Sequence, residues 1–408
     1  MYDTEDNKEK AILIGTGSLD DLDELNELLI TAGGIEVGRL VQNITKANAA
    51  HYIGKGKLEE LAEEVYIKDA GLAIFDDELT GAQIRNIEKE LKVRVIDRTQ
   101  IILDIFAKRA SSKEGKLQVE LAQLKYLLPR LSGFGVEMSR AGAGIGTRGP
   151  GEQKLEIDRR RIRERISSLE DEIKQIKRHR NTQRKSRSNM YNICLVGYTN
   201  SGKSTLLNSL SDSNIYVEDK LFATLDPTTR RIRLKSGEEV TITDTVGFIR
   251  NLPYDLIEAF KSTLEEVTYA DLLLHVVDAS NESYEEQIKA VDSILKDLQV
   301  YDKPTILVVN KTDKTDEQIF IPKGFKDVVY ISAKEKANLN VLLKKIEDYA
   351  EEDSSLVELG ITYNQAHLIP YLYENGKVIK KEYKAGHIYI KGKFSPLVIG
   401  KVKEYIVK

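Results

Sequence analysis

YNICLVGYTNSGKSTLLNSL, residues 191–210, is an apolar run followed by the pattern Gly197-x4-Gly202-Lys203-Ser204 and then by a helical pattern. A strand, a glycine-rich turn and a helix in this order are the context that a phosphate-binding P-loop requires. The glycines let backbone N–H groups converge on phosphate oxygens, the lysine adds a positive charge, and the serine hydroxyl can ligate Mg²⁺. The stretch therefore predicts a nucleotide-binding domain with a mostly parallel sheet.

A second motif, VTITDTVGF at residues 240–248, follows where such a domain needs it. Asp244 ends a predicted strand, so its carboxylate can hold Mg²⁺ through water. Gly247 comes three residues later, and its N–H is expected to meet the γ-phosphate of a nucleoside triphosphate. The two motifs together predict a site that distinguishes a triphosphate from a diphosphate.

Two more motifs end predicted strands, NKTD at 310–313 and SAK at 332–334, and they select the base. A carboxylate at Asp313 accepts hydrogen bonds from the N1–H and the exocyclic amine of guanine, whereas adenine has no hydrogen on N1. Leaving this carboxylate unpaired costs about 1–3 kcal/mol or more, which gives strong discrimination. The ligand is therefore predicted to be GTP or GDP. The candidate GTP-binding residues are Gly197, Tyr198, Thr199, Asn200, Ser201, Gly202, Lys203, Ser204, Thr205, Phe222, Ala223, Thr224, Leu225, Asp226, Asp244, Thr245, Val246, Gly247, Asn310, Lys311, Asp313, Ser332, Ala333 and Lys334.

The segment KLFATLDPTTRR, residues 220–231, lies where a loop that responds to the γ-phosphate is expected. Thr224 and Thr228 both offer hydroxyl groups for Mg²⁺, and the resemblance to related GTPases favours Thr224 within FATLD. The candidate metal ligands are thus Ser204 and Thr224, with Asp244 acting through water.

Phe248 stands where many small GTPases carry a glutamine that orients the attacking water, and Ile249 follows it. Neither side chain can form a hydrogen bond with water. We therefore expect a GTPase with slow intrinsic turnover, in which Lys203, Thr224 and Gly247 are the catalytic residues. A partner that supplies the missing groups can accelerate such an enzyme by about 10³ to 10⁵.

Asn200 suggests a second cation. GTPases that use a monovalent cation often resemble this P-loop, GYTNSGKS, with an asparagine at the same position as a ligand. One hypothesis is that K⁺ binds at Asn200. The equally weighted alternative is that asparagine is present because it tolerates an unusual backbone angle.

Residues 108–190 are basic, with 21 Lys and Arg against 10 Asp and Glu, although the whole chain has a net charge of −4. Leucines 117, 121, 124 and 128 form one helical stripe. A heptad seam follows at Leu155, Ile162, Ile166, Leu169, Ile173 and Ile176. This pattern predicts an antiparallel helical hairpin.

The segment between the two helices, residues 132–152, is too rich in glycine to continue either of them. It is expected to form an arginine-bearing tip that enters a groove of a polyanion, the alternative being a solvated linker without a ligand. The candidate RNA contacts are Arg140, Arg148, Lys154, Arg159 and Arg160.

The remaining segments predict two smaller α/β domains. From Ala11 to about Ala107 short apolar runs alternate with helical patterns, which indicates a mostly parallel sheet. The turn at residues 54–57, GKGK, could hold a phosphate, but an ordinary glycine turn is favoured because the motif is short. Lysines alternate along the strands expected after Val357, where they could contact RNA or keep an edge strand soluble. The expected domains are 1–108, 109–190, 191–355 and 356–408.

Composition excludes several classes of protein. At about 150 residues a domain, 408 residues predict two or three domains, and 41% hydrophobic with 31% charged residues is ordinary globular composition. No apolar run exceeds four residues, so an integral membrane protein is not expected. A polar, acidic N-terminus and the single Cys194, expected to serve packing, are typical of a cytoplasmic protein.

Taken together, these segments resemble the HflX family of GTPases. The resemblance rests on residues 118–166 and on GYTNSGKSTLLN, LFATLDPTTRR and DTVGFIRNLP, in the family's order; one departure is GPGEQKLE, where the family usually has GPGETQLE. It implies an enzyme that binds the large ribosomal subunit and ribosomal RNA, with the glycine-rich tip approaching the peptidyl transferase centre. It also implies that the enzyme splits stalled ribosomes under stress and that the ribosome stimulates GTP hydrolysis.

Other functions remain open at the level of sequence. The chain could be a ribosome-assembly GTPase that acts on immature large subunits, or a signalling GTPase that docks proteins through its coiled coil. ATP-dependent RNA unwinding by the N-terminal domain is conceivable, but the sequence contains no second complete nucleotide motif. The free protein is expected to be a monomer.

Overall fold

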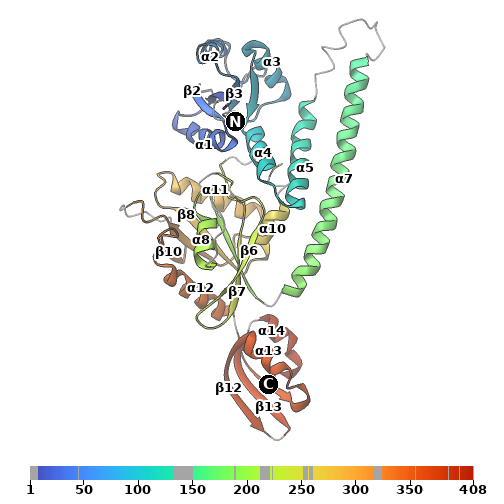
Figure 1. The fold of residues 1–408 in the computed structure, drawn as a ribbon, viewed down its shortest axis with the longest axis vertical. Coiled ribbons are helices and arrows are strands. Elements are labelled where there is room, and N and C mark those ends of the chain that lie inside the picture. Colours follow the sequence, from blue (N-terminus) through green and yellow to red (C-terminus); the bar gives the residue numbers. More distant parts are fainter. Residues whose placement is uncertain are drawn as a thin grey trace, which may run out of the picture. The chain divides into compact units, whose positions relative to one another are not determined.

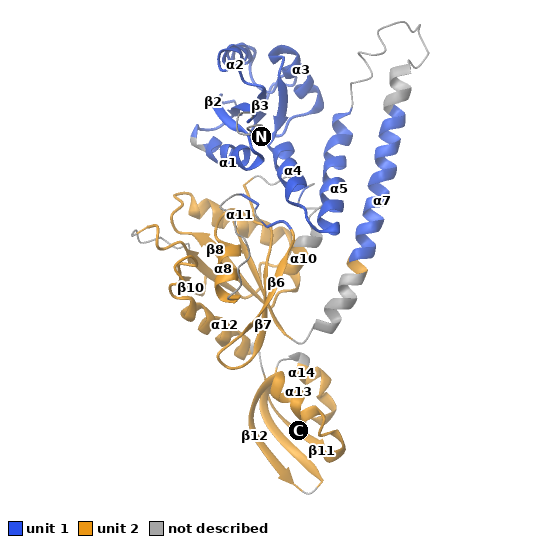
Figure 2. Ribbon diagram, in the orientation of Figure 1, with its two compact units in different colours: residues 1–176, 219–225, 251–261 blue, residues 177–218, 226–250, 262–408 orange. Residues whose placement is uncertain are grey.

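The computed structural model describes residues 8–44, 46–131, 150–187, 190–211, 221–222, 224–250, 256, 261–315, 324–353, 355–384, 386–394 and 396–407 (Figure 1). The chain divides into two compact units (Figure 2). The first comprises residues 1–176, 219–225 and 251–261, and the second comprises 177–218, 226–250 and 262–408. The predicted multidomain α/β fold class is confirmed.

The first unit begins with a four-stranded parallel sheet in the order β2-β1-β3-β4. Apolar side chains of β1 are fully buried because helices flank the sheet, which explains the nearly continuous apolar runs in the sequence. The GKGK turn begins the helix α2, and Gly54 is its N-cap. The elements are β1 (Lys10–Gly15), η1 (Asp20–Leu22), α1 (Asp23–Ala32), β2 (Ile35–Val41), α2 (Lys55–Ile67), β3 (Leu72–Phe75), α3 (Gly81–Leu91), β4 (Arg94–Asp97) and α4 (Arg98–Arg109).

The helical hairpin consists of α5 (Lys113–Arg130) and α7 (Pro150–Arg187). The hydroxyl of Ser112 caps α5 by accepting the N–H of Gly115 at 2.9 Å. A compact apolar seam joins the helices, with Leu169 fully buried at its centre. The seam consists of Leu117, Leu121, Leu124, Ile166, Leu169, Ile173 and Ile176, so the predicted stripes meet over part of their length.

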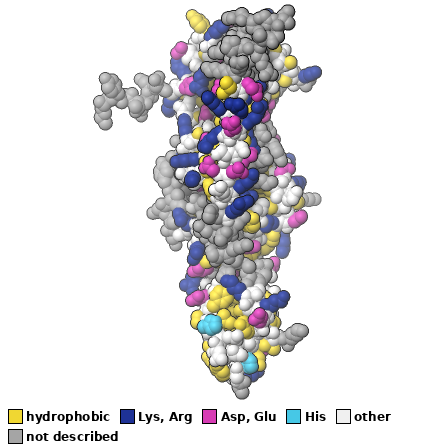
Figure 3. All heavy atoms as spheres, turned by 90° about the vertical axis from the view of Figure 1, so that its right-hand side faces the viewer, with side chains coloured by type: hydrophobic (Ala, Val, Ile, Leu, Met, Phe, Trp, Pro, Cys, Tyr) yellow, Lys and Arg dark blue, Asp and Glu magenta, His cyan; other side chains and the backbone are white. Residues whose placement is uncertain are grey.

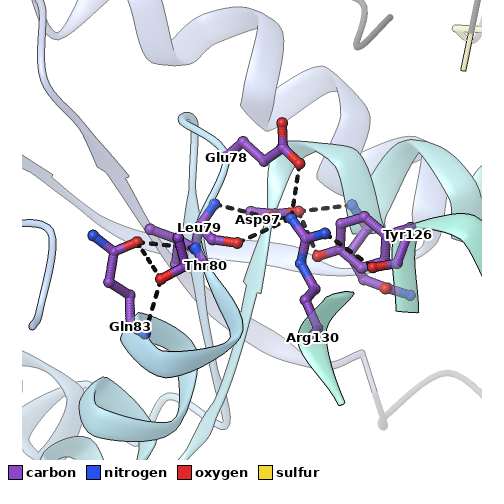
Figure 4. Close-up of polar contacts among 8 residues, drawn as sticks. Glu78, Leu79, Thr80, Gln83, Asp97, Tyr126 and Arg130 are labelled. Atoms are coloured by element: carbon purple, nitrogen blue, oxygen red, sulfur yellow. Dashed lines mark hydrogen bonds and ion pairs between the residues drawn. The ribbon is translucent and has the colours of Figure 1, made fainter. Parts of the chain in front are cut away.

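A buried polar cluster fastens the end of α5 to the N-terminal sheet (Figure 4). Asp97, which is fully buried, accepts the hydroxyl of Tyr126 at 2.8 Å, the N–H of Leu79 at 3.0 Å and the guanidinium of Arg130 at 3.2 Å. Arg130 also donates to the carbonyl of Leu79 and to Glu78, both at 2.9 Å. Its guanidinium lies 3.5 Å from the centre of the Tyr126 ring. We name this group the Asp97–Arg130 cluster. The cluster thus fixes the position of Arg130, which lies two residues before the glycine-rich segment 132–152.

The second unit contains the sheet predicted from the P-loop. Its strands lie in the order β10-β9-β8-β5-β7-β6, and all neighbours are parallel except β6 and β7. Cys194 is buried in β5, and burial raises the pKa of its thiol, as expected of a packing residue. The elements are β5 (Tyr191–Gly197), α8 (Lys203–Ser211), β6 (Thr228–Arg233), β7 (Glu239–Asp244), α10 (Lys261–Tyr269), β8 (Leu272–Asp278), α11 (Tyr284–Asp297), β9 (Thr305–Asn310), β10 (Asp327–Tyr330) and α12 (Leu339–Asp353).

The C-terminal part of the second unit is a three-stranded antiparallel sheet in the order β11-β13-β12. Its own apolar core includes Leu359, Ile390 and Phe394. The elements are β11 (Ser355–Thr362), η2 (Tyr363–Gln365), α13 (Leu368–Glu374), β12 (Gly376–Lys384), β13 (His387–Phe394), α14 (Pro396–Lys401) and η3 (Lys403–Tyr405). Among the residues that the structure describes, no helix has the length and apolar character needed to span a membrane.

Candidate functional site

The phosphate-binding turn lies between β5 and α8, at the carboxyl end of the central parallel strand. Gly197 and Gly202 have φ angles of +151° and +93°, which L-residues with side chains rarely adopt. A Cβ on Gly202 would lie 2.2 Å from the amide nitrogen of Asn310. Both glycines are therefore required by backbone conformation, and the second is also required by its contact with the base-binding motif.

Lys203 is the first residue of α8, and its side chain reaches back to this turn. Its ammonium group donates to the carbonyls of Gly197 at 3.0 Å and Tyr198 at 2.6 Å. Burial lowers the pKa of this lysine to about 8, and the carboxylate of Asp244 opposes that effect. The positive charge is thus held at a fixed point in the turn, where it can pair with nucleotide phosphates.

The predicted Mg²⁺ ligands of the second unit lie together. The hydroxyl of Ser204 donates to the buried carboxylate of Asp244 at 2.6 Å. Hydroxyl and carboxylate oxygens are the donors that Mg²⁺ prefers, so these residues fit the ion. Among the described residues no group of three or more His, Cys, Asp or Glu side chains could hold a metal alone. Such an ion would take its remaining ligands from phosphate and water.

The loop after Asp244 lies directly against the P-loop. The N–H of Thr199 donates to the carbonyl of Phe248 at 2.7 Å, and the N–H of Phe248 donates to the carbonyl of Gly197 at 3.1 Å. A Cβ on Gly247 would lie 2.8 Å from the Cα of Thr199. The side chains of Phe248 and Ile249 are each 1% exposed, so they pack inward and offer nothing to a water molecule.

The two motifs predicted to select the base converge on the P-loop. The amide of Asn310 donates to the carbonyl of Ser201 at 2.9 Å, and its oxygen accepts the N–H of Ala333 at 2.9 Å. The hydroxyl of Ser332 donates to Asp313 at 2.5 Å, and this bond lowers the pKa of the Asp313 carboxyl. Three sequence motifs, two of which lie more than a hundred residues after the P-loop, are therefore brought together in the second unit.

Sequence reasoning missed Asp278, which ends β8 and forms an ion pair with Lys311 at 2.7 Å. This pair holds the ammonium group of a lysine within the NKTD motif. The available signal was an aspartate directly after the apolar strand LLLHVV, in the same position relative to its strand as Asp244. Several parallel strands end in polar residues at this edge, and sequence alone does not say which of them pair.

The loop expected to respond to the γ-phosphate is divided between the units. Residues 221–225 belong to the first unit, where Phe222 is 2% exposed and its ring packs edge-on to Phe106, with 4.6 Å between centroids. Thr224 is partly buried there, and its role as a Mg²⁺ ligand stays a prediction. Ala223 lies outside the described residues. Thr228, the other candidate, begins β6 in register with Asp244.

Asn200 has a φ of +60° and is exposed. This left-handed conformation is the one that asparagine tolerates better than most side chains, so the alternative explanation for this residue has a structural basis. The carboxamide of an exposed asparagine is also a suitable ligand for K⁺. The conformation therefore leaves both hypotheses in place.

Two of the five candidate RNA contacts have described side chains. Arg159 is partly buried on α7, and the side chain of Arg160 is 70% exposed and lies 3.7 Å from Glu164. Arg140, Arg148 and the side chain of Lys154 lie outside the described residues. Figure 3 shows a face of the molecule on which Lys and Arg side chains are interspersed with Asp and Glu.

Comparison with known proteins adds three family matches. Residues 19–107 match the family described as GTP-binding GTPase N-terminal, residues 109–187 match GTP-binding GTPase Middle Region, and residues 192–311 match 50S ribosome-binding GTPase. Each match covers one segment of the chain, and together they span most of it.

Two individual relatives are both GTPase HflX proteins. The chain is 51% identical over 407 residues to a GTPase HflX of Caldanaerobacter subterraneus, covering 98% of this chain and 94% of the relative. It is 45% identical over 399 residues to a GTPase HflX of Lacrimispora saccharolytica, covering 96% and 94%. Among solved structures, a GTP-binding protein of Sulfolobus solfataricus in complex with GDP has 28% identity and a TM-score of 0.45, covering 84% of this chain and 99% of that one.

Proposed function

This chain belongs to the HflX family of GTPases, and on that premise we propose that it binds the large ribosomal subunit and splits stalled ribosomes. In this proposal it acts as a cytoplasmic monomer, and the ribosome stimulates its hydrolysis of GTP. The partner is suggested by the description of the family that residues 192–311 match, 50S ribosome-binding GTPase.

The observation that carries the proposal is chemical. The two residues after Gly247 are apolar and buried, so the attacking water has no side chain from this position to orient it. An enzyme with such a site hydrolyses GTP slowly by itself. A large partner that contacts the loop can contribute the missing group or fix the water, and acceleration of about 10³ to 10⁵ is within the range that partners achieve.

The chain's own residues perform the remaining tasks. Lys203 holds a positive charge at the β- and γ-phosphates, the N–H of Gly247 reaches the γ-phosphate, and Asn310 joins the base motifs to the P-loop. Ser204 and Asp244 would hold Mg²⁺, with Thr224 as a further ligand. When bound, the ion neutralises charge that develops on the phosphate oxygens.

The helical hairpin supports an RNA partner. The arginines of α7 form exposed ion pairs, such as Arg163 with Glu156 at 3.7 Å and Arg161 with Asp158 at 3.9 Å. Exposed pairs contribute about 0–1 kcal/mol each, so their guanidinium groups can turn to phosphate at little cost. The proposal places Arg159 and Arg160 against ribosomal RNA, with Arg140, Arg148 and Lys154 nearer the tip.

Sedimentation tests the proposal. Purified protein is mixed with intact ribosomes and with GTP, a non-hydrolysable GTP analogue or GDP, and the particles are separated on sucrose gradients. We expect the GTP form to bind large subunits and to increase free subunits at the expense of intact ribosomes. Binding only to immature large subunits would support an assembly factor instead, and no binding in any state would exclude a ribosomal partner.

We also propose that K⁺ binds at Asn200, and one variant separates this from the alternative. Asn200→Gly keeps the left-handed backbone readily available but removes the carboxamide. If Asn200 is a ligand, the wild type turns over faster in KCl than in NaCl and the glycine variant shows no difference. Equal rates of the wild type in the two salts, or a variant that keeps its preference for K⁺, would remove the idea.

A further inference from the structure

Tyr198 connects the phosphate-binding turn to the loop that follows Asp244. Its carbonyl accepts the ammonium of Lys203 at 2.6 Å. It also forms a parallel β-bridge with Phe248, made by two backbone hydrogen bonds of 2.7 and 3.1 Å on either side of it. One residue therefore contacts both the lysine that binds phosphate and the loop that is expected to sense the γ-phosphate.

The side chain of Tyr198 extends this connection. It is 7% exposed, and its hydroxyl accepts the backbone N–H of Arg250 at 2.5 Å. Arg250 lies two residues beyond Phe248, so the hydroxyl attaches a part of the loop that the β-bridge does not reach. A phenylalanine would fill nearly the same space, so the hydroxyl is the group that makes the attachment.

These attachments confine Gly247. It lies between the end of β7 at Asp244 and the attached residues Phe248 and Arg250. A Cβ on Gly247 would lie 3.1 Å from the ammonium of Lys203, so the glycine backbone is beside that charge. We propose that Tyr198 is a positioning residue for GTP hydrolysis, whose hydroxyl holds the loop so that the N–H of Gly247 meets the γ-phosphate. The proposal rests on the GTPase activity and does not depend on a ribosomal partner.

The test is Tyr198→Phe, which removes only the hydroxyl. One hydrogen bond contributes about 0.5–1.5 kcal/mol, which corresponds to about a two- to tenfold fall in the intrinsic single-turnover rate of GTP hydrolysis. We expect the affinity for GDP and the KM for GTP to stay unchanged, because the P-loop and the base motifs keep their contacts. The matched control is Tyr349→Phe, which removes a hydroxyl that donates to Asp327 at 2.8 Å in the same unit. The control should keep the wild-type rate.

Amide hydrogen exchange gives a second readout that does not depend on activity. In the wild type the N–H of Arg250 should be protected, and in Tyr198→Phe it should exchange faster, while Tyr349→Phe leaves it unchanged. Equal exchange in all three proteins would overturn the proposal, because the attachment would then not exist in solution. A Tyr198→Phe variant that hydrolyses GTP at the wild-type rate, or that loses GDP affinity as strongly as rate, would overturn it as well.

Discussion

At the scale of single residues, Asp313 is the residue predicted to select the base. Its carboxylate is held by the hydroxyl of Ser332, and the lowered pKa of its carboxyl keeps it ionised at neutral pH. An ionised carboxylate only accepts hydrogen bonds, which matches the two neighbouring N–H groups of guanine. A base that presents a hydrogen-bond acceptor in place of one of these two N–H groups would pair poorly with the carboxylate.

Asp313→Asn should therefore change specificity from guanine toward xanthine. The amide offers one donor and one acceptor, which match the carbonyl and the N1–H of xanthine. We expect GTP affinity to fall by about 10² or more, since a mismatched hydrogen bond costs about 2–4 kcal/mol in such a site. Competition binding with GTP and XTP measures the change. The control Asp297→Asn, at the exposed end of α11, should keep the wild-type preference.

Lys203 predicts a pH dependence of nucleotide binding. Burial lowers the pKa of its ammonium from 10.5 to about 8. The folded chain therefore releases a proton at pH values where the unfolded chain keeps it, so this lysine makes the free energy of unfolding rise with pH between the two pKa values. Phosphates bind the protonated lysine, so affinity for GDP should fall above about pH 8, by up to about tenfold per pH unit.

Titrations with a fluorescent GDP analogue between about pH 7 and about pH 9 check this prediction. Guanosine, which has no phosphate, is the control ligand, because it contacts the base motifs alone. A parallel fall in the affinity for guanosine would assign the effect to another group.

The residues proposed to carry the chemistry could be identified in the sequence because each belongs to a short motif with a fixed spacing. The contacts that join one motif to another could not be predicted from the sequence. Asp278 pairs with Lys311, and Tyr198 accepts the N–H of Arg250, because the parallel sheet brings loops from different strands to one edge. Those partners depend on the path of each loop, which the spacing of residues along one strand does not encode.

At the scale of elements, the α5–α7 hairpin depends on a short apolar seam. Leu169 is fully buried, and it packs with the apolar side chains of α5 in this seam. Leu169→Ala should lower the free energy of unfolding of the first unit by about 2–5 kcal/mol, because it loses burial and leaves a cavity. Urea unfolding followed by circular dichroism measures the loss.

A charge substitution on the same pair of helices provides the control. Arg165 and Glu120 join α7 to α5 at 2.7 Å, but both side chains are more than 40% exposed. Glu120→Gln should therefore change stability by less than about 1 kcal/mol. If it destabilised the hairpin as much as Leu169→Ala, the ion pair would be the main connection between the helices.

The stripes of the hairpin were predictable and the length of the seam was not. A heptad pattern indicates which face of a helix is apolar, but it does not state how far the partner helix extends. Ile162 continues the stripe of α7 and Leu128 continues that of α5, yet both are only partly buried and lie outside the seam. Apolar residues beyond the packed turns are thus the part of the pattern that sequence overestimates.

At the scale of the whole molecule, the uneven charge predicts how binding to RNA depends on salt. Residues 156–178 carry eight Lys or Arg and six Asp or Glu, so most of the basic excess of residues 108–190 lies elsewhere in that segment. Affinity that depends on phosphate contacts falls steeply with salt concentration, whereas an apolar coiled-coil interface would barely respond. Composition revealed the basic segment, but the ion pairs within α7 came only from the structure.

Arg159→Gln combined with Arg160→Gln tests this view. If each arginine contacts one phosphate, the slope of log affinity against log salt should become shallower by about 2. Binding to large subunits in the presence of a GTP analogue, measured at several KCl concentrations, gives the slope. Lys289→Gln, an exposed lysine on α11, is the matched control. An unchanged slope in the double variant would place the RNA contacts elsewhere.

The Asp97–Arg130 cluster limits how the helical hairpin could be separated from the rest of the first unit. A shortened chain that begins at residue 109 would keep both helices but lose Asp97, the carboxylate that Arg130 and Tyr126 share. The guanidinium and the phenol would then have no common acceptor, and the last turn of α5 would lack its anchor. A chimaera that carries the glycine-rich segment on another scaffold would therefore also have to include the preceding β-sheet, which supplies Asp97.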